Sequence, residues 1–106
     1  MLAFGENLRR LLGIHDIRGR EAANLIGVST QSLSGWMQGH RQPNLQMLLR
    51  VASFLEISGE RLLQTPFDEL LVREVADRRR FEIVEAKIAS AREGNGAVRS
   101  RRQARA

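Results

Sequence analysis

Apolar residues recur at spacings of three and four through the first 63 residues of the chain, which is the period of an amphipathic helix. The pattern predicts five helices, over residues 3–12, 20–26, 30–38, 45–55 and 59–63, and no alternating strand pattern competes. Ser29, Asn44 and Ser58 precede three of these helices and are suited to cap them. We therefore expect an all-α fold. Its predicted core comprises Leu8, Leu11, Leu25, Ile26, Leu33, Trp36, Leu48, Leu49, Ala52, Leu55 and Leu62.

Residues 22–36 carry small, turn and apolar residues at the spacing of a helix-turn-helix. The methyl group of Ala23 lets a second helix cross closely, and Gly27 suits the left-handed end of the first helix. Apolar residues of the second helix recur at helical spacing, namely Val28, Leu33 and Trp36. The same set also occurs in ordinary antiparallel helix pairs, so the flanking sequence has to decide between the two interpretations.

The flanking residues favour a DNA-binding domain. From Phe4 to Leu63, over about 60 residues, the chain resembles the helix-turn-helix domain of the Cro and lambda-repressor type, the XRE family. The residues that carry the resemblance are Phe4, Leu8, Leu11, Gly27, Val28, Ser29, Gly39, Pro43, Asn44, Ala52, Leu55, Ser58, Leu62 and Leu63. The resemblance implies a five-helix fold that binds double-stranded DNA.

The resemblance also implies that the helix over residues 30–38 enters the major groove with its polar side. The expected base-contacting residues are Thr30, Gln31, Ser32, Ser34 and Gly35. Gln31 leads this set, because its amide can pair with adenine N6 and N7. Gly35 has no side chain to read with, which fits either close backbone approach to DNA or recognition of fewer base pairs.

Phosphate contacts are expected at helix starts and in the loop after the recognition helix. The candidates are Arg18, Arg20, Ser29, Gln38, His40, Arg41 and Asn44, with Arg41 the leading one. The family commonly has a phosphate-binding glutamine where this chain has Gly19; Arg18 and Arg20 either replace that contact or are ordinary surface residues. Leu12 and Met37 stand where the family often has a buried ion pair, which predicts an apolar contact between them.

A long helix is expected to begin after Thr65-Pro66 and to end near Arg92. Its first apolar stripe is expected to pack on the domain. Its second stripe is the predicted homodimer interface and comprises Phe81, Val84, Ile88 and Ala91. A two-fold dimer sets two recognition helices about 34 Å apart, one turn of DNA. The long helix is also the expected site for any protein partner.

The net charge of +5 lies mainly in the tail, residues 94–106, which has four basic and no acidic residues. This tail has too few apolar residues to pack, so we expect disorder, with either nonspecific DNA binding or no role. The predicted divisions are the DNA-binding domain over residues 1–65, the C-terminal helix over 66–93, and the tail. The chain has no cysteine, and His15 and His40 are expected at the surface without metal-ligand partners. We therefore expect no metal and no cofactor.

The sequence has no membrane-length apolar run, no signal-peptide pattern and no recognisable catalytic constellation. We expect a cytoplasmic, non-enzymatic, dimeric transcriptional regulator, a repressor that occupies a palindromic operator. Repression is implied by the family resemblance alone. The alternative is an antitoxin-type module, whose C-terminal helix binds a toxin and which regulates its own operon.

Overall fold

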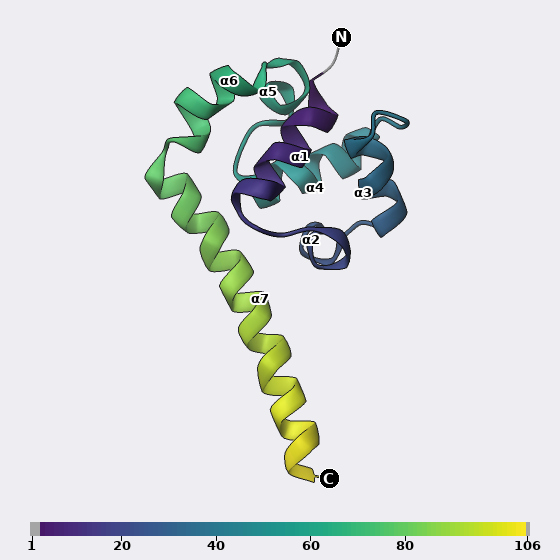
Figure 1. Ribbon diagram of the computed structural model, residues 1–106, viewed down its shortest axis with the longest axis vertical. Helices are drawn as coiled ribbons and strands as arrows, with labels where there is room; N and C mark the ends of the chain where they lie inside the picture. Colours follow the sequence, from purple (N-terminus) through teal and green to yellow (C-terminus); the bar gives the residue numbers. More distant parts are fainter. Residues whose placement is uncertain (1–2, 106) are drawn as a thin grey trace.

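The structure is a computed structural model that describes the backbone of residues 3–105 and the side chains of residues 3–94. Over this range it is helical, without β-strands. Figure 1 shows a body of short helices, beyond which the last helix continues. The elements are α1 (Phe4–Ile14), α2 (Gly19–Ile26), α3 (Thr30–Met37), α4 (Leu45–Leu55), α5 (Gly59–Gln64), α6 (Phe67–Leu70), the π-helical turn η1 (Leu71–Val75) and α7 (Arg78–Arg105).

The first five helices lie where the apolar pattern predicts them, and the three predicted caps are confirmed. The side chain of Ser29 accepts a hydrogen bond from the Ser32 amide at the start of α3. Asn44 and Ser58 cap α4 and α5 in the same way, each through an amide three residues further on. Capping of this kind contributes about 1 kcal/mol per helix.

The apolar core lies between α1, α2, α3, α4 and α5 and includes most of its predicted members. Leu25, Met37 and Ala52 are partly buried against this core, which includes Leu12. The direct contact between Leu12 and Met37 stays a prediction. Leu49 is the exception, because 56% of it is exposed. It follows Leu48 on α4 by about 100° of helical rotation, which turns it to the outer side of this helix.

The predicted single helix over residues 66–92 is wrong at Asp77, where the chain breaks between η1 and α7. The Asp77 carboxylate accepts hydrogen bonds from the Arg79 and Arg80 amides at 3.0 and 3.3 Å, which caps the new helix. The predicted end before Gly94 is also wrong, since α7 runs to Arg105. Extending an existing helix costs far less than nucleating one, and the alanine, arginine and glutamine beyond Gly94 favour helix. Ala106 lies outside the described residues.

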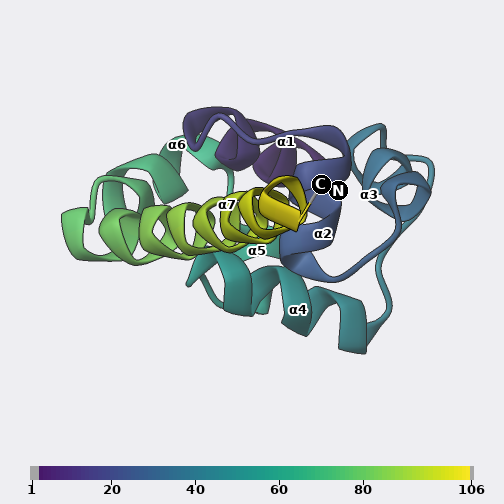
Figure 2. The same cartoon turned by 90° about the horizontal axis from the view of Figure 1, so that it is seen from below.

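Two residues of the second stripe of the C-terminal helix, Val84 and Ile88, pack on their own domain, so their assignment to a dimer interface is wrong; the assignment of the half-buried Phe81 and Ala91 stays a prediction. Val84 and Ile88 are 0% and 3% exposed within a single chain and belong to the same core as α1 to α5. Phe81 is half-buried and stacks on His15, with ring centroids 4.7 Å apart. Ala91 lies beside α2. Figure 2 shows α7 crossing the side of the body formed by α1 and α4, and it packs on α4.

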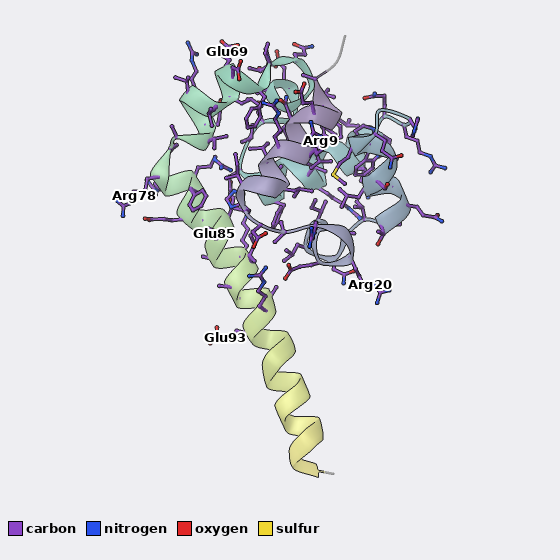
Figure 3. All side chains as sticks on the ribbon, in the orientation of Figure 1. Arg9, Arg20, Glu69, Arg78, Glu85 and Glu93 are labelled. Carbon is purple, nitrogen blue, oxygen red and sulfur yellow. The ribbon has the colours of Figure 1, made fainter. Side chains whose placement is uncertain are left out.

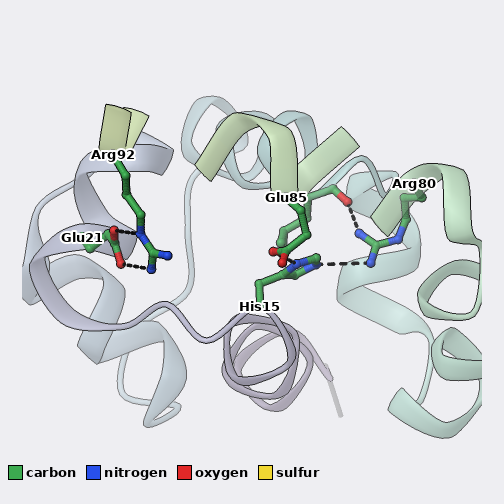
Figure 4. A network of polar contacts seen from close by, with 6 residues as sticks. His15, Glu21, Arg80, Glu85 and Arg92 are labelled. Atoms are coloured by element: carbon green, nitrogen blue, oxygen red, sulfur yellow. Dashed lines mark hydrogen bonds and ion pairs between the residues drawn. The ribbon is translucent and has the colours of Figure 1, made fainter. Parts of the chain in front are cut away.

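Polar contacts fix α7 in this position (Figure 4). His15 is 4% exposed, so its predicted surface position is wrong; its Nδ1 lies 2.9 Å from Glu85 Oε2. Arg80 is also buried and donates hydrogen bonds to the Leu55 and Glu74 carbonyls. Burial lowers the pKa of Arg80, an effect that nearby acidic residues oppose. Arg80 also lies 3.5 Å from His15 Nε2. Because an arginine can only donate, His15 Nε2 has to accept, which favours the His15 tautomer whose proton is on Nδ1.

Within the described residues, no helix combines the length and the apolar character needed to cross a membrane.

Candidate nucleic-acid interface

The turn between α2 and α3 has the backbone that its glycine predicts. Gly27 ends α2 at φ +89°, and its amide donates to the Ala23 carbonyl at 2.8 Å. This left-handed conformation strains a residue that has a Cβ. Ala23 is 1% exposed, which confirms its position at the helix crossing. Arg50 of α4 also donates to the Gly27 carbonyl, a brace that sequence analysis missed because the two residues are 23 positions apart.

Two buried residues fix how α3 is rotated. Leu33 and Trp36 are 0% and 2% exposed, and Val28 packs partly buried against the same core. Phe4 of α1 meets the Trp36 ring edge to face, with centroids 6.1 Å apart. A Cβ at Gly5 would collide with the Trp36 carbonyl, so glycine is what lets α1 approach the end of α3. The opposite side of α3 consequently faces outward.

The outward side of α3 and the loop after it form one shallow surface depression. Its lining residues are Thr30, Gln31, Ser34, Gly35, Gln38, His40 and Arg41. The depression therefore brings four of the predicted base-contacting residues together with three of the predicted phosphate-contacting ones. None of the seven is acidic, as a surface that meets DNA requires. Gln38 also donates to the Ser34 hydroxyl at 3.2 Å.

Ser32 does not line this depression. It is half-buried, and its hydroxyl accepts a hydrogen bond from Ser29 at 2.9 Å while its amide donates to the same Ser29 oxygen. The two serines thus form the cap of α3. The Ser32 hydroxyl thus supports the Ser29 cap of α3, and its contact with a base stays a prediction.

The loop after α3 folds back onto Gly35. The His40 and Arg41 amides both donate to the Gly35 carbonyl, at 2.9 and 3.2 Å. A Cβ at Gly35 would lie 3.1 Å from Cδ and 3.3 Å from Cγ of Arg41, so the arginine stem occupies the space of the missing side chain. This packing accounts for the glycine without close DNA approach, and sequence analysis did not anticipate it.

The remaining phosphate candidates lie at helix starts outside the depression. Arg18 and Arg20 are exposed on either side of Gly19, and Figure 3 shows Arg20 extending from α2. Gly19 has φ +57°, which explains why glycine, and not the glutamine common in the family, stands there. Ser29 and Asn44 are exposed, but each uses its side chain as a helix cap.

A carboxylate next to Arg20 is paired by α7 (Figure 4). Arg92 donates from two guanidinium nitrogens to both oxygens of Glu21, at 2.7 and 2.9 Å. These hydrogen bonds and the positive charge of Arg92 lower the pKa of Glu21. The pair compensates the negative charge of Glu21 beside Arg20 at the start of α2. Sequence analysis missed it because Arg92 is 71 residues away.

The helix-turn-helix family model matches residues 7–70, more than half of the chain. The chain belongs to the XRE type of this family. A transcriptional regulator from Listeria innocua has a similar crystal structure, with a TM-score of 0.55 and 25% sequence identity. The similarity covers 86% of this chain and 92% of that one, so it extends past α5 into the C-terminal segment. No curated protein sequence matches this helix-turn-helix protein.

Proposed function

We propose that this helix-turn-helix protein is a sequence-specific transcriptional repressor that places α3 in the major groove of its operator. One observation carries the proposal: the exposed side of α3 and the following loop form a single depression lined by polar and basic residues. The family and the described role of the Listeria innocua protein support transcriptional regulation. Repression follows if the bound protein blocks access of polymerase to the promoter.

Gln31 and Thr30 are the residues that read base edges in this proposal. Both are exposed in the first turn of α3, which in this motif meets the bases. The Gln31 amide is suited to adenine, since it both donates and accepts as the N6 and N7 edge requires. Thr30 offers a hydroxyl and a methyl group. Ser34 lies one turn further along the same side.

Phosphate contacts fix the protein on the duplex in this proposal. Arg18 and Arg20 bracket the start of α2, and Asn44 begins α4, where first-turn amides face outward. His40 and Gln38 flank the depression on the loop side. These contacts set orientation and salt dependence, while α3 supplies the sequence preference.

A homodimer is part of the proposal, because a single eight-residue recognition helix specifies few base pairs. The dimer surface lies outside Val84 and Ile88, which are covered within one chain. The antitoxin alternative loses its main support for the same reason, since the apolar side of α7 is not available for a toxin. The proposal also places the protein in the cytoplasm, where its DNA is.

Fluorescence anisotropy tests the proposal. The full chain is titrated onto the DNA upstream of its own gene and onto a scrambled duplex, at several salt concentrations. We expect a preference of roughly 10³-fold or more, which Gln31→Ala reduces toward the scrambled level. Gln64→Ala makes the same change on α5, outside the depression, and is expected to bind like wild type. Equal, steeply salt-dependent binding to both duplexes would contradict sequence-specific repression.

A further inference from the structure

We propose that Arg41 reads a guanine in the major groove, from the position on α3 that Gly35 leaves open. The inference rests on the proposed function and adds the base that the site selects. It assigns Arg41 to base recognition, where the family pattern implies a phosphate contact from this loop. Gly35 is then the residue that makes this recognition possible.

The path of the Arg41 side chain is the first support. Its Cγ and Cδ lie over Gly35, so the stem crosses α3 at the family's groove-facing position. The two hydrogen bonds to the Gly35 carbonyl hold the loop backbone against the helix. A phosphate-binding arginine needs only to extend outward from the loop, whereas this stem packs on Gly35, and Arg41 lines the same depression as Gln31 and Ser34.

The state of the Arg41 head group is the second support. Among the described residues it has no hydrogen-bond or ion-pair partner, whereas Arg61 and Arg92 each pair with a glutamate. No acidic residue lines the depression. The guanidinium is therefore available to a ligand, and its stem is already partly ordered by packing on Gly35, which reduces the entropy lost on binding.

The chemistry of the head group selects guanine. A guanidinium donates two parallel hydrogen bonds to O6 and N7 of guanine, while adenine presents a donor in place of O6. A good bidentate pair of this kind discriminates against the wrong base by roughly 5- to 150-fold. Contact with phosphate would give no base preference at all.

Selection from a randomised duplex library, followed by sequencing of the bound DNA, tests the assignment. Wild type is expected to enrich a motif that contains a guanine dependent on Arg41. Arg41→Ala and Arg41→Lys should lose the preference at that guanine and keep the rest of the motif. In the wild type, 7-deazaguanine at that position should weaken binding by at least 5-fold, with no effect on Arg41→Ala. Circular dichroism melts check that each variant is folded.

Two results would overturn the proposals separately. If wild type enriches no motif, the proposed function fails. If Arg41→Ala keeps the complete motif and binds all sequences more weakly by the same factor, Arg41 contacts phosphate and only the further inference fails.

A second substitution tests the role of Gly35. Gly35→Ala should disturb the same guanine preference in the wild type and have no further effect in Arg41→Ala. An equal effect in both backgrounds would show that Gly35 acts independently of Arg41 and would refute its assigned role.

Discussion

Val84 of α7 provides the sharpest test of how the C-terminal helix is used. The residue is fully buried within one chain. Val84→Ala removes two methyl groups, worth about 1.6 kcal/mol in transfer free energy at ~0.8 kcal/mol each. The cavity that remains, of roughly 50 Å³, adds about 1 kcal/mol. We therefore expect a loss of roughly 2–3 kcal/mol in the free energy of unfolding, and a Tm lower by about 10–20 °C.

Ile83→Ala is the matched control, because Ile83 precedes Val84 on the same helix and is 39% exposed. It removes more carbon atoms and should nevertheless cost less than about 1 kcal/mol. Urea and thermal denaturation of both variants, followed by circular dichroism at two protein concentrations, measures the difference. Sedimentation measures the oligomeric state. The reasoning is refuted if Val84→Ala is no worse than Ile83→Ala, or if its main effect is the loss of a dimer.

Three further results are expected. Gly5→Ala should lower the free energy of unfolding by about 1–3 kcal/mol in urea denaturation, because the added Cβ meets the backbone of α3. Gly13→Ala is the control on the same helix, where the added Cβ has open space, and should raise the free energy of unfolding by up to about 1 kcal/mol. Equal values for the two variants would refute the close approach of α1 to α3. Ser58→Ala should cost about 1 kcal/mol in the same assay, through loss of the α5 cap. In an NMR titration the Glu21 carboxyl should have a pKa below 4.5, rising toward it in Arg92→Gln. Because folding lowers this pKa, the pair stabilises fully above the unfolded value and loses its contribution as pH falls through the folded value.

The sequence predicts the first five helices well because their determinants are local. A capping side chain three residues before the amide it accepts from, and a glycine at a left-handed helix end, act within one turn of chain. The boundaries at Ser29, Asn44 and Ser58 follow from these local rules. The same rules describe Asp77, whose cap on α7 was overlooked within a run of charged residues.

The partner of α7 is less predictable, because an apolar stripe does not reveal which surface covers it. The four-residue spacing of Val84 and Ile88 fits a dimer interface and an intramolecular core equally well. The structure selects the core through contacts between residues far apart in sequence, such as His15 with Glu85. The mistaken surface position of His15 has the same origin, since its polar partner lies 70 residues away.

The candidate interface likewise has a part that helical spacing predicts and a part that depends on how the loop after α3 folds. Family resemblance and helical spacing indicated Thr30 and Gln31, and the structure places both on the exposed side of α3. The relation between Gly35 and Arg41 was out of reach, because it depends on how the loop after α3 folds back. Gly35 alone suggested either close backbone approach to DNA or recognition of fewer base pairs, whereas the structure shows that the Arg41 stem fills the space beside it.

The packing of α7 also constrains any partner that binds through it. Displacing α7 from the domain exposes its own Val84 and Ile88, at about 1.5–3 kcal/mol for each buried aliphatic side chain. The displacement also breaks the hydrogen bond from Arg80 of α7 to the Leu55 carbonyl and separates Arg92 from Glu21. The last change restores an unpaired negative charge beside Arg20, at the start of α2, where phosphate is expected. A partner that displaced α7 would therefore weaken both the fold and its attraction for DNA, whereas one that bound the exposed side of α7 would disturb neither.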